Sequence, residues 1–299
     1  MFAFQLLLAT VAAAASFYDA RDIAEAGPVA RAESNKTQAK FGDEYYNYWL
    51  YEADTNSYDL TRGNSTNAKT LKAGEKTITV NPGKSALLVV DMQNYFLNPA
   101  YTDFPKGLAT VQPTIDSVKA FRAAGAKIIW CQWGLTDYDL QFIPPSYKIS
   151  FSTDKDPEQS FGSEMGVYNG TDYGRKLVPK EYNALPYDPL WELAQEGLAA
   201  GTDLYFNKNR QSCLWGAQTP TGLYLEENQI TTLFISGVNI DQCVFGTFND
   251  AYYKGWDPIV VQDASATSSP QYAYDMVMYN VDKHGFAVNS SDIVTGLAA

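Results

Sequence analysis

Histidine is almost absent from this sequence of 299 residues, and the shortage excludes several kinds of catalytic site. With His284 as the one histidine, a zinc site built from several histidines is impossible. A serine or cysteine nucleophile activated by histidine would have to use this same residue. His284 precedes a glycine in a polar stretch after an expected helix, which favours a helix end or a surface position. Proton transfer must therefore depend mainly on other side chains.

Cysteine is also scarce. Only Cys131, Cys213 and Cys243 occur, which is too few for a fold held together by disulfides. An odd number leaves at least one thiol free, unless it pairs with another chain. Cys131 and Cys213 could bond to each other, but the sequence leaves that question open.

Basic runs are missing as well, and this bears on the choice of partner. The net charge is −12 and the pI is near 4.5. Nucleic acid and anionic membranes are therefore poor candidate partners. The length suits one large α/β domain with an N-terminal extension.

The apolar stretch at residues 2–15, FAFQLLLATVAAAA, is too short to cross a membrane well. It resembles a secretory signal with a cleavage site before Ser16. Four glycosylation sequons begin at Asn35, Asn64, Asn169 and Asn289. We therefore expect a secreted glycoprotein, with no membrane attachment after removal of the signal. Its parts would be a signal peptide at 1–15, an arm at 16–80 and a main domain at 81–299.

The arm contains an aromatic stretch at residues 41–62, which is rich in tyrosine and tryptophan. A turn-like sequence at 54–57 separates two β-prone halves and predicts a hairpin that lies on the main domain. Residues 76–80 alternate in polarity and predict an edge strand. The aromatic side chains either pack against the neighbouring layer or form a surface for carbohydrate or a protein partner.

The main domain alternates apolar strands with helices. The strands are expected at 86–90, 127–133, 203–207, 233–235, 258–261 and 286–289. The helices are expected at 111–124, 190–199, 244–255 and 271–279. This pattern predicts an α/β fold in which a parallel sheet is covered by helices on both faces. The long segment at 134–189, rich in Pro, Gly, Ser and Asp, is expected to be a surface excursion.

Three residues whose side chains can take part in catalysis follow expected strands. Asp91, Lys208 and Cys243 all lie at carboxyl ends, where sheets of this kind place their sites. Cys243 stands where the strand at 233–235 turns into a helix, so the helix dipole is expected to lower the pKa of its thiol. A cysteine on its own is more often a small buried hydrophobe than a nucleophile.

The three side chains together permit nucleophilic catalysis without histidine. Lys208 can favour the thiolate of Cys243, and Asp91 can accept and return a proton. The alternative is a purely structural ion pair between Asp91 and Lys208, because a lysine on that strand face would otherwise meet an apolar layer. The two interpretations do not exclude each other.

Three sequence blocks resemble the signatures of the isochorismatase-like cysteine hydrolases. They are ALLVVDMQNYF at 86–96, DLYFNKNRQSCLWG at 203–216 and LFISGVNIDQCVFGTFNDAYYKGWDPIVVQDA at 233–264. The resemblance covers about residues 84–289. It implies a three-layer α/β/α fold with a six-stranded parallel sheet.

The same resemblance assigns roles to residues. Asp91 would be the general acid and base, Lys208 its cationic partner and Cys243 the nucleophile. A cis peptide bond is expected between Val238 and Asn239. The backbone N–H groups of Asn239 and Cys243 would then form the oxyanion hole.

Departures from the family pattern narrow the expected function. Nicotinamidases of the family carry a metal site of aspartate and two histidines after the second strand, but residues 132–137 here lack histidine, so we expect no metal or cofactor. Isochorismatases that cleave a vinyl ether usually lack the cysteine, so its presence favours amide chemistry. Candidate pocket walls, each of which could equally be core, are Gln93, Phe96, Trp133 and Trp215.

We therefore expect a secreted hydrolase that cleaves a C–N bond of a small amide or carbamoyl compound through a thioester. One alternative is hydrolysis of isochorismate, with Asp91 protonating the vinyl ether. Another is a non-catalytic secreted protein that binds a partner through the aromatic arm and the long segment. Homo-oligomers are common among such relatives.

Overall fold

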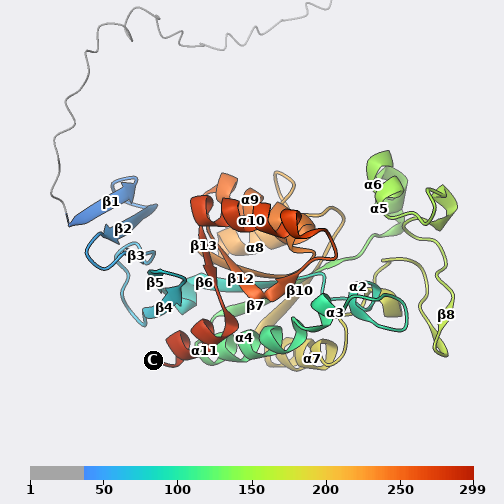
Figure 1. Ribbon diagram of the computed structural model, residues 1–299, viewed down its shortest axis with the longest axis horizontal. Coiled ribbons are helices and arrows are strands. Elements are labelled where there is room, and N and C mark those ends of the chain that lie inside the picture. Colours follow the sequence, from blue (N-terminus) through green and yellow to red (C-terminus); the bar gives the residue numbers. More distant parts are fainter. Residues whose placement is uncertain (1–36) are drawn as a thin grey trace, which may run out of the picture. The chain divides into compact units, whose positions relative to one another are not determined.

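The computed structural model describes residues 37–299, and these form one compact unit (Figure 1). The expected signal peptide at 1–15, the first part of the arm and the sequon at Asn35 lie outside the described residues. Within 37–299, no helix combines the length and the apolar character needed to cross a membrane.

The main sheet has six parallel strands in the order β10-β7-β6-β11-β12-β13. These strands are β6 (Ser85–Val90), β7 (Lys127–Trp133), β10 (Asp203–Lys208), β11 (Thr232–Val238), β12 (Asp257–Ala266) and β13 (Phe286–Val288). All six expected strands are present, and β6 and β11 are buried along their whole length. Continuous burial explains why their sequences are uninterrupted apolar runs without alternation.

Helices cover both faces of this sheet, which confirms the predicted three-layer α/β/α architecture (Figure 1). One face carries α4 (Val111–Ala123), α7 (Leu190–Ala200) and α11 (Ser290–Ala298). The other carries α8 (Pro220–Glu227), α9 (Phe245–Lys254) and α10 (Gln271–His284). The sequence did not predict α8 and α11.

The segment at 134–189 is a surface excursion with short elements of its own. It contains α5 (Asp137–Phe142), α6 (Pro145–Ser150), η2 (Pro157–Gln159), β8 (Val167–Tyr168), β9 (Thr171–Asp172) and η3 (Tyr182–Ala184). The other short helical elements are η1 (Pro82–Lys84), α2 (Asn94–Leu97), α3 (Pro105–Leu108) and η4 (Ile240–Val244).

The aromatic arm forms a five-stranded sheet in the order β1-β2-β3-β5-β4. Its strands are β1 (Gln38–Gly42), β2 (Tyr48–Glu52), β3 (Ser57–Asp59), β4 (Lys69–Ala73) and β5 (Lys76–Val80). The predicted hairpin is present as β2 and β3. The prediction that β5 is an edge strand was wrong, because β4 pairs antiparallel with it and takes the edge. Leu71 and Ala73, two positions apart in β4, are buried, but so short an alternation in the sequence is only a weak indication of a strand.

A buried carboxylate at the start of β12 anchors this second sheet to the main one. Asp257 accepts hydrogen bonds from Trp49 Nε1 at 2.7 Å, from Arg62 Nη2 at 2.7 Å and from Thr232 Oγ1 at 2.9 Å. Burial raises the pKa of Asp257, and the guanidinium of Arg62 opposes that shift. Trp49 also packs against Phe286, with ring centroids 5.4 Å apart. Packing against the main sheet therefore explains why the innermost side chains of the arm are aromatic.

Three of the four sequons lie within the described residues. Asn64 and Asn169 are exposed in turns, where an added glycan would meet solvent. Asn289 is half-buried and caps α11, and its Nδ2 donates a hydrogen bond to Asp292 Oδ2 at 3.3 Å. Glycosylation stays a prediction, with Asn64 and Asn169 as the better acceptors.

Candidate active site

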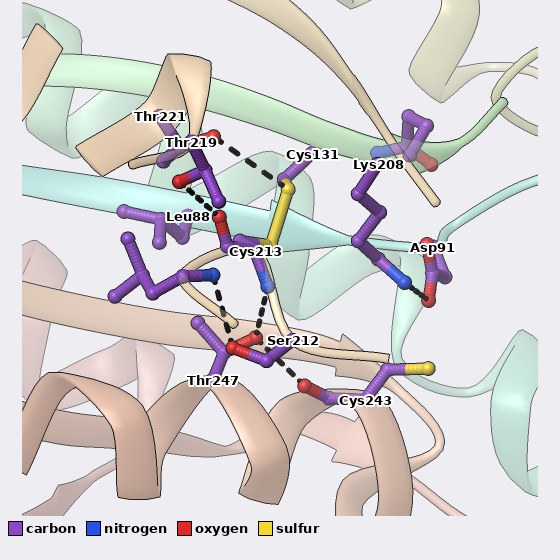
Figure 2. The surroundings of a disulfide bond; sticks show 12 residues. Leu88, Asp91, Cys131, Lys208, Ser212, Cys213, Thr219, Thr221, Cys243 and Thr247 are labelled. Atoms are coloured by element: carbon purple, nitrogen blue, oxygen red, sulfur yellow. Dashed lines mark hydrogen bonds and ion pairs between the residues drawn. A yellow bond between two sulfur atoms is a disulfide. The ribbon is translucent and has the colours of Figure 1, made fainter. Parts of the chain in front are cut away.

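The carboxyl ends of three strands bring the predicted residues together. Asp91 directly follows β6, Lys208 is the last residue of β10, and Cys243 lies in the turn η4 after β11. The Nζ atom of Lys208 lies 2.8 Å from Asp91 Oδ2. Figure 2 shows this ion pair, with the sulfur of Cys243 turned toward the same side. The exposed fractions of Asp91, Lys208 and Cys243 are 0%, 6% and 3%, so water barely reaches the cluster.

The backbone at the end of β11 allows this close assembly. Gly237 has φ +125°, and a Cβ added there would collide with the carbonyl oxygen of Val90 in β6. Glycine is therefore required where the two strands approach each other. One residue further along, the peptide bond between Val238 and Asn239 is cis, as the family resemblance implied.

Asp91 is a buried carboxylate that could accept more hydrogen bonds than it does. Its Oδ1 accepts a hydrogen bond from the backbone N–H of Trp133 at 3.0 Å. Its Oδ2 takes part in the ion pair with Lys208 but has no hydrogen-bond partner of standard geometry within 37–299. Burial raises the pKa of Asp91, while the positive charge of Lys208 and the neighbouring thiol of Cys243 lower it. Such a carboxylate is well suited to accept a proton.

Lys208 is held by three different contacts. Beyond its ion pair with Asp91, its Nζ donates a hydrogen bond to the backbone oxygen of Arg210 at 3.1 Å. The same nitrogen lies 4.0 Å from the ring centroid of Trp133, within range of a cation–π interaction. The buried ammonium is therefore paired and fixed in position, as its place in an apolar layer requires.

The thiol of Cys243 differs from the expectation in one respect. We expected the helix dipole and Lys208 to lower its pKa, but burial raises it, and this effect exceeds the opposing effect of Lys208. The cysteine also lies inside η4 rather than at the first turn of α9, which begins at Phe245. Burial therefore favours the protonated form of this thiol.

A disulfide joins Cys131 and Cys213 beside this cluster, which answers the question that the sequence left open (Figure 2). The backbone N–H of Cys213 donates to Thr247 Oγ1 at 3.1 Å, and that hydroxyl donates to the backbone oxygen of Cys243 at 2.8 Å. Thr247 therefore links the disulfide to the turn that carries the thiol. Sequence reasoning missed Thr247, although it lies four residues after Cys243, one helical turn away.

The four candidate pocket residues lie in different environments. Gln93 is buried, and its Nε2 donates to the backbone oxygens of Trp133 at 2.8 Å and Ala184 at 2.7 Å. Phe96 is half-buried against Tyr95. Trp215 is 48% exposed and donates its indole N–H to Asn209 at 3.1 Å. Trp133 alone of the four contacts both Asp91 and Lys208.

Comparison with known proteins places the chain in a family. Residues 85–292 match the family model described as Isochorismatase domain. The chain belongs to the isochorismatase family. The matched region contains Asp91, Lys208 and Cys243, whereas the five-stranded sheet of the arm precedes it.

Solved structures share the isochorismatase fold at low sequence identity. Nicotinamidase PncA from Bacillus subtilis is 22% identical with a TM-score of 0.53, covering 69% of this chain and 99% of its own. A cysteine hydrolase from Pseudomonas syringae pv. phaseolicola is 18% identical with a TM-score of 0.52, covering 73% and 94%. An isochorismatase family protein from Burkholderia thailandensis is 20% identical with a TM-score of 0.52, covering 74% and 98%. At these identities the likeness shows the fold alone.

In the described part of this isochorismatase-family chain, residue types that commonly bind metals are not clustered. Among residues 37–299, no three side chains of histidine, cysteine, aspartate or glutamate are grouped so that they could hold an ion. His284 is the last residue of α10, and its ring stacks on Tyr252 with centroids 4.5 Å apart. The cluster itself brings together the thiol of Cys243, the carboxylate of Asp91 and the ammonium of Lys208.

Proposed function

We propose that this protein is a cysteine hydrolase that cleaves a C–N bond of a small amide or carbamoyl compound. The observation that carries the proposal is the buried Asp91–Lys208 ion pair at 2.8 Å, beside the free thiol of Cys243. A thiol next to a base oriented by a third group is the usual arrangement for nucleophilic catalysis.

The proposed reaction has two steps. Asp91 accepts the thiol proton of Cys243 while the sulfur bonds to the substrate carbonyl carbon. The backbone N–H groups of Asn239 and Cys243 donate to the oxygen on which negative charge develops. Asp91 then gives its proton to the leaving nitrogen as the C–N bond breaks, which leaves a thioester. Water attacks that thioester with Asp91 as base, and the acid and the free thiol are released.

The surroundings of the cluster favour small, uncharged substrates. Trp133 packs against Phe151 and Phe161, with ring centroids 5.2 Å apart in both pairs, and these two rings come from the excursion at 134–189. Apolar walls of this kind penalise a charged ligand that brings no partner of its own. Because Cys243 is only 3% exposed, substrate entry requires movement of the covering side chains.

The proposed site of action is outside the cell. Disulfides persist mainly in oxidising compartments, and Cys131 and Cys213 are bonded. The signal-like sequence at 2–15 and the exposed sequons at Asn64 and Asn169 favour the same compartment.

A second candidate is hydrolysis of the vinyl ether of isochorismate. The raised pKa of Asp91 favours this reaction, because a carboxyl group that keeps its proton can act as a general acid. The thiol of Cys243 would then be dispensable.

A substrate panel with acid-quenched mass spectrometry tests these proposals. The panel contains small primary amides including nicotinamide, N-carbamoyl compounds and isochorismate. We expect amine or ammonia release from one amide class, together with an acyl group trapped on Cys243. Turnover of isochorismate alone, without an acyl-enzyme, would support the second candidate. No turnover and no adduct across the panel would favour the non-catalytic alternative.

The pH dependence of turnover is a further expected result. Asp91 must be ionised to accept the thiol proton, and burial raises its pKa, so the acid limb of kcat/KM should have its midpoint above the ordinary carboxyl value of 3.8. A raised pKa also means that the folded state binds this proton more tightly than the unfolded chain does. The stability from Asp91 is thus fully present below the unfolded pKa and is lost as pH rises through the folded pKa.

As the pH rises through the pKa of Asp91, activity should therefore increase, while the stability that Asp91 contributes should decrease. Kinetics and tryptophan fluorescence measured at the same pH values distinguish catalytic protonation from acid unfolding. A rate that stays constant below pH 3.8 in folded protein would contradict the role of Asp91 as base.

A further inference from the structure

A cleft of about 530 Å³ lies between the aromatic arm and the carboxyl ends of α9 and α10. The arm contributes Phe41 and Trp49 to its walls, and the main domain contributes Tyr252, Trp256 and His284. Ligand pockets in proteins usually have volumes of about 300–1,000 Å³ and mainly apolar or aromatic walls. The cleft therefore has the size and the lining of a binding site for a small ligand.

This cleft lies at the opposite edge of the main sheet from the candidate active site. Its floor includes Asp257 and Pro258, the first two residues of β12. Asp91 and Cys243, in contrast, follow the carboxyl ends of β6 and β11. The arm, which supplies one wall, precedes the region at 85–292 that matches the family model. A ligand in the cleft would therefore have a role separate from the proposed chemistry.

Two aromatic rings of the cleft are only partly covered by protein. Phe41 pairs with Trp49 across β1 and β2, so both side chains point to the same face of the small sheet. Trp49 is half-buried against the main sheet, whereas Phe41 is 56% exposed. On the facing wall, Tyr252 is 42% exposed. Covering these apolar ring faces with a ligand would remove them from water, which is favourable.

The lining of the cleft offers no free charge to a ligand. No lysine, arginine or glutamate of the described residues lines it. Its one carboxylate, Asp257, is 2% exposed and already forms an ion pair with Arg62. An ionic ligand would lose water in the cleft without gaining a partner of opposite charge. The cleft therefore favours an uncharged ligand.

Uncharged hydrogen-bonding groups are present beside the rings. Asn47 Nδ2 donates to the backbone oxygen of Gly255 at 3.1 Å, and Asn47 Oδ1 accepts from Arg62 Nη2 at 2.6 Å. The amide can still donate one hydrogen bond and accept another. His284 Nδ1 has no hydrogen-bond partner of standard geometry within 37–299. The cleft thus combines apolar ring faces with amide and imidazole groups whose hydrogen-bonding capacity is not fully used.

We propose that this cleft binds a neutral saccharide. One face of a sugar ring consists of C–H bonds, which pack against the electron-rich face of an aromatic ring. The hydroxyl groups of the sugar donate and accept hydrogen bonds, which suits Asn47 and His284. A purely apolar ligand would leave these polar groups without partners. The site attaches the protein to a glycan and takes no part in turnover.

Isothermal titration calorimetry of the purified protein tests the proposal. The protein is first deglycosylated with an enzyme, so that no attached glycan occupies the cleft. The probes are cellohexaose, chitohexaose and mannohexaose, with hexagalacturonate as a charged saccharide and a neutral peptide that contains two phenylalanines. We expect saturable binding of at least one of the three neutral saccharides. Binding of none of these three, whether or not the other probes bind, would overturn the proposal.

Replacement of Phe41 or Tyr252 by alanine locates the bound saccharide. Both side chains are partly exposed, so neither variant should lose its fold. Each variant removes one of the two ring faces, and we expect each to weaken binding of the saccharide about tenfold. Unchanged affinity in either folded variant would show that the saccharide does not lie between these rings, and would refute the proposed site.

Tyr253 offers a matched control. It is the next residue of α9, is 76% exposed and does not line the cleft. Tyr253→Ala should bind the saccharide as tightly as the wild type does, and a tenfold loss in this variant would contradict the proposal. The titrations do not depend on turnover. Saccharide binding without amide hydrolysis would therefore refute the hydrolase function alone, and hydrolysis without saccharide binding would refute the cleft alone.

Discussion

Replacing Cys243 with alanine is expected to abolish hydrolysis of the best amide, with kcat reduced at least about 10,000-fold. The reason is that the proposed reaction passes through a covalent bond to this sulfur, and among residues 37–299 Cys243 is the one cysteine outside a disulfide. The side chain is small, so its truncation should leave the fold intact. Steady-state kinetics and circular dichroism on the same preparation check both statements.

The Cys243→Ser variant tests whether the position needs a thiol rather than any nucleophile. A hydroxyl at the same place is far less acidic than a thiol, so this variant should also be inactive on amides. Undiminished amide turnover in either variant would exclude the thioester route. Retained hydrolysis of isochorismate alone would assign the chemistry to Asp91.

Removal of the disulfide by the double substitution Cys131→Ala and Cys213→Ala is expected to lower the free energy of unfolding by about 4 kcal/mol. The bond joins residues 82 positions apart, so it closes a long loop and restricts the unfolded chain. Urea unfolding under non-reducing conditions measures the difference between wild type and variant.

Reductant supplies the matched control for this prediction. It should destabilise the wild type by a similar amount and leave the double variant unaffected, because that variant has no bond to reduce. A double variant as stable as the oxidised wild type would contradict the prediction.

Kinetics on the same proteins also test the contact through Thr247, which joins Cys213 to the backbone oxygen of Cys243. Loosening that contact should lower kcat more than it changes KM.

Local sequence patterns were enough to predict the main sheet. Buried parallel strands such as β6 and β11 are continuous apolar runs, so their position and type are encoded within a few residues. Because parallel strands align their carboxyl ends, the positions of Asp91, Lys208 and Cys243 in the sequence also predicted that they meet.

The arm was predicted less well because strand order depends on distant pairing. The hairpin of β2 and β3 has a local turn and was found. The place of β5 depends on β4, whose alternation is weak, and on the parallel contact with β3, which no local signal encodes.

The sequence by itself determined the fold class, the family blocks and the three residues of the candidate site, because each of these depends on short-range patterns of apolar and reactive side chains. Only the tertiary structure decided the direction in which the pKa of the Cys243 thiol shifts, the bond between Cys131 and Cys213, and the contacts of Trp133 with the ion pair. These depend on burial and on distances between residues far apart in the chain. Burial in particular reversed the expected shift of the thiol pKa, because the loss of water around sulfur outweighs the attraction of a single neighbouring ammonium.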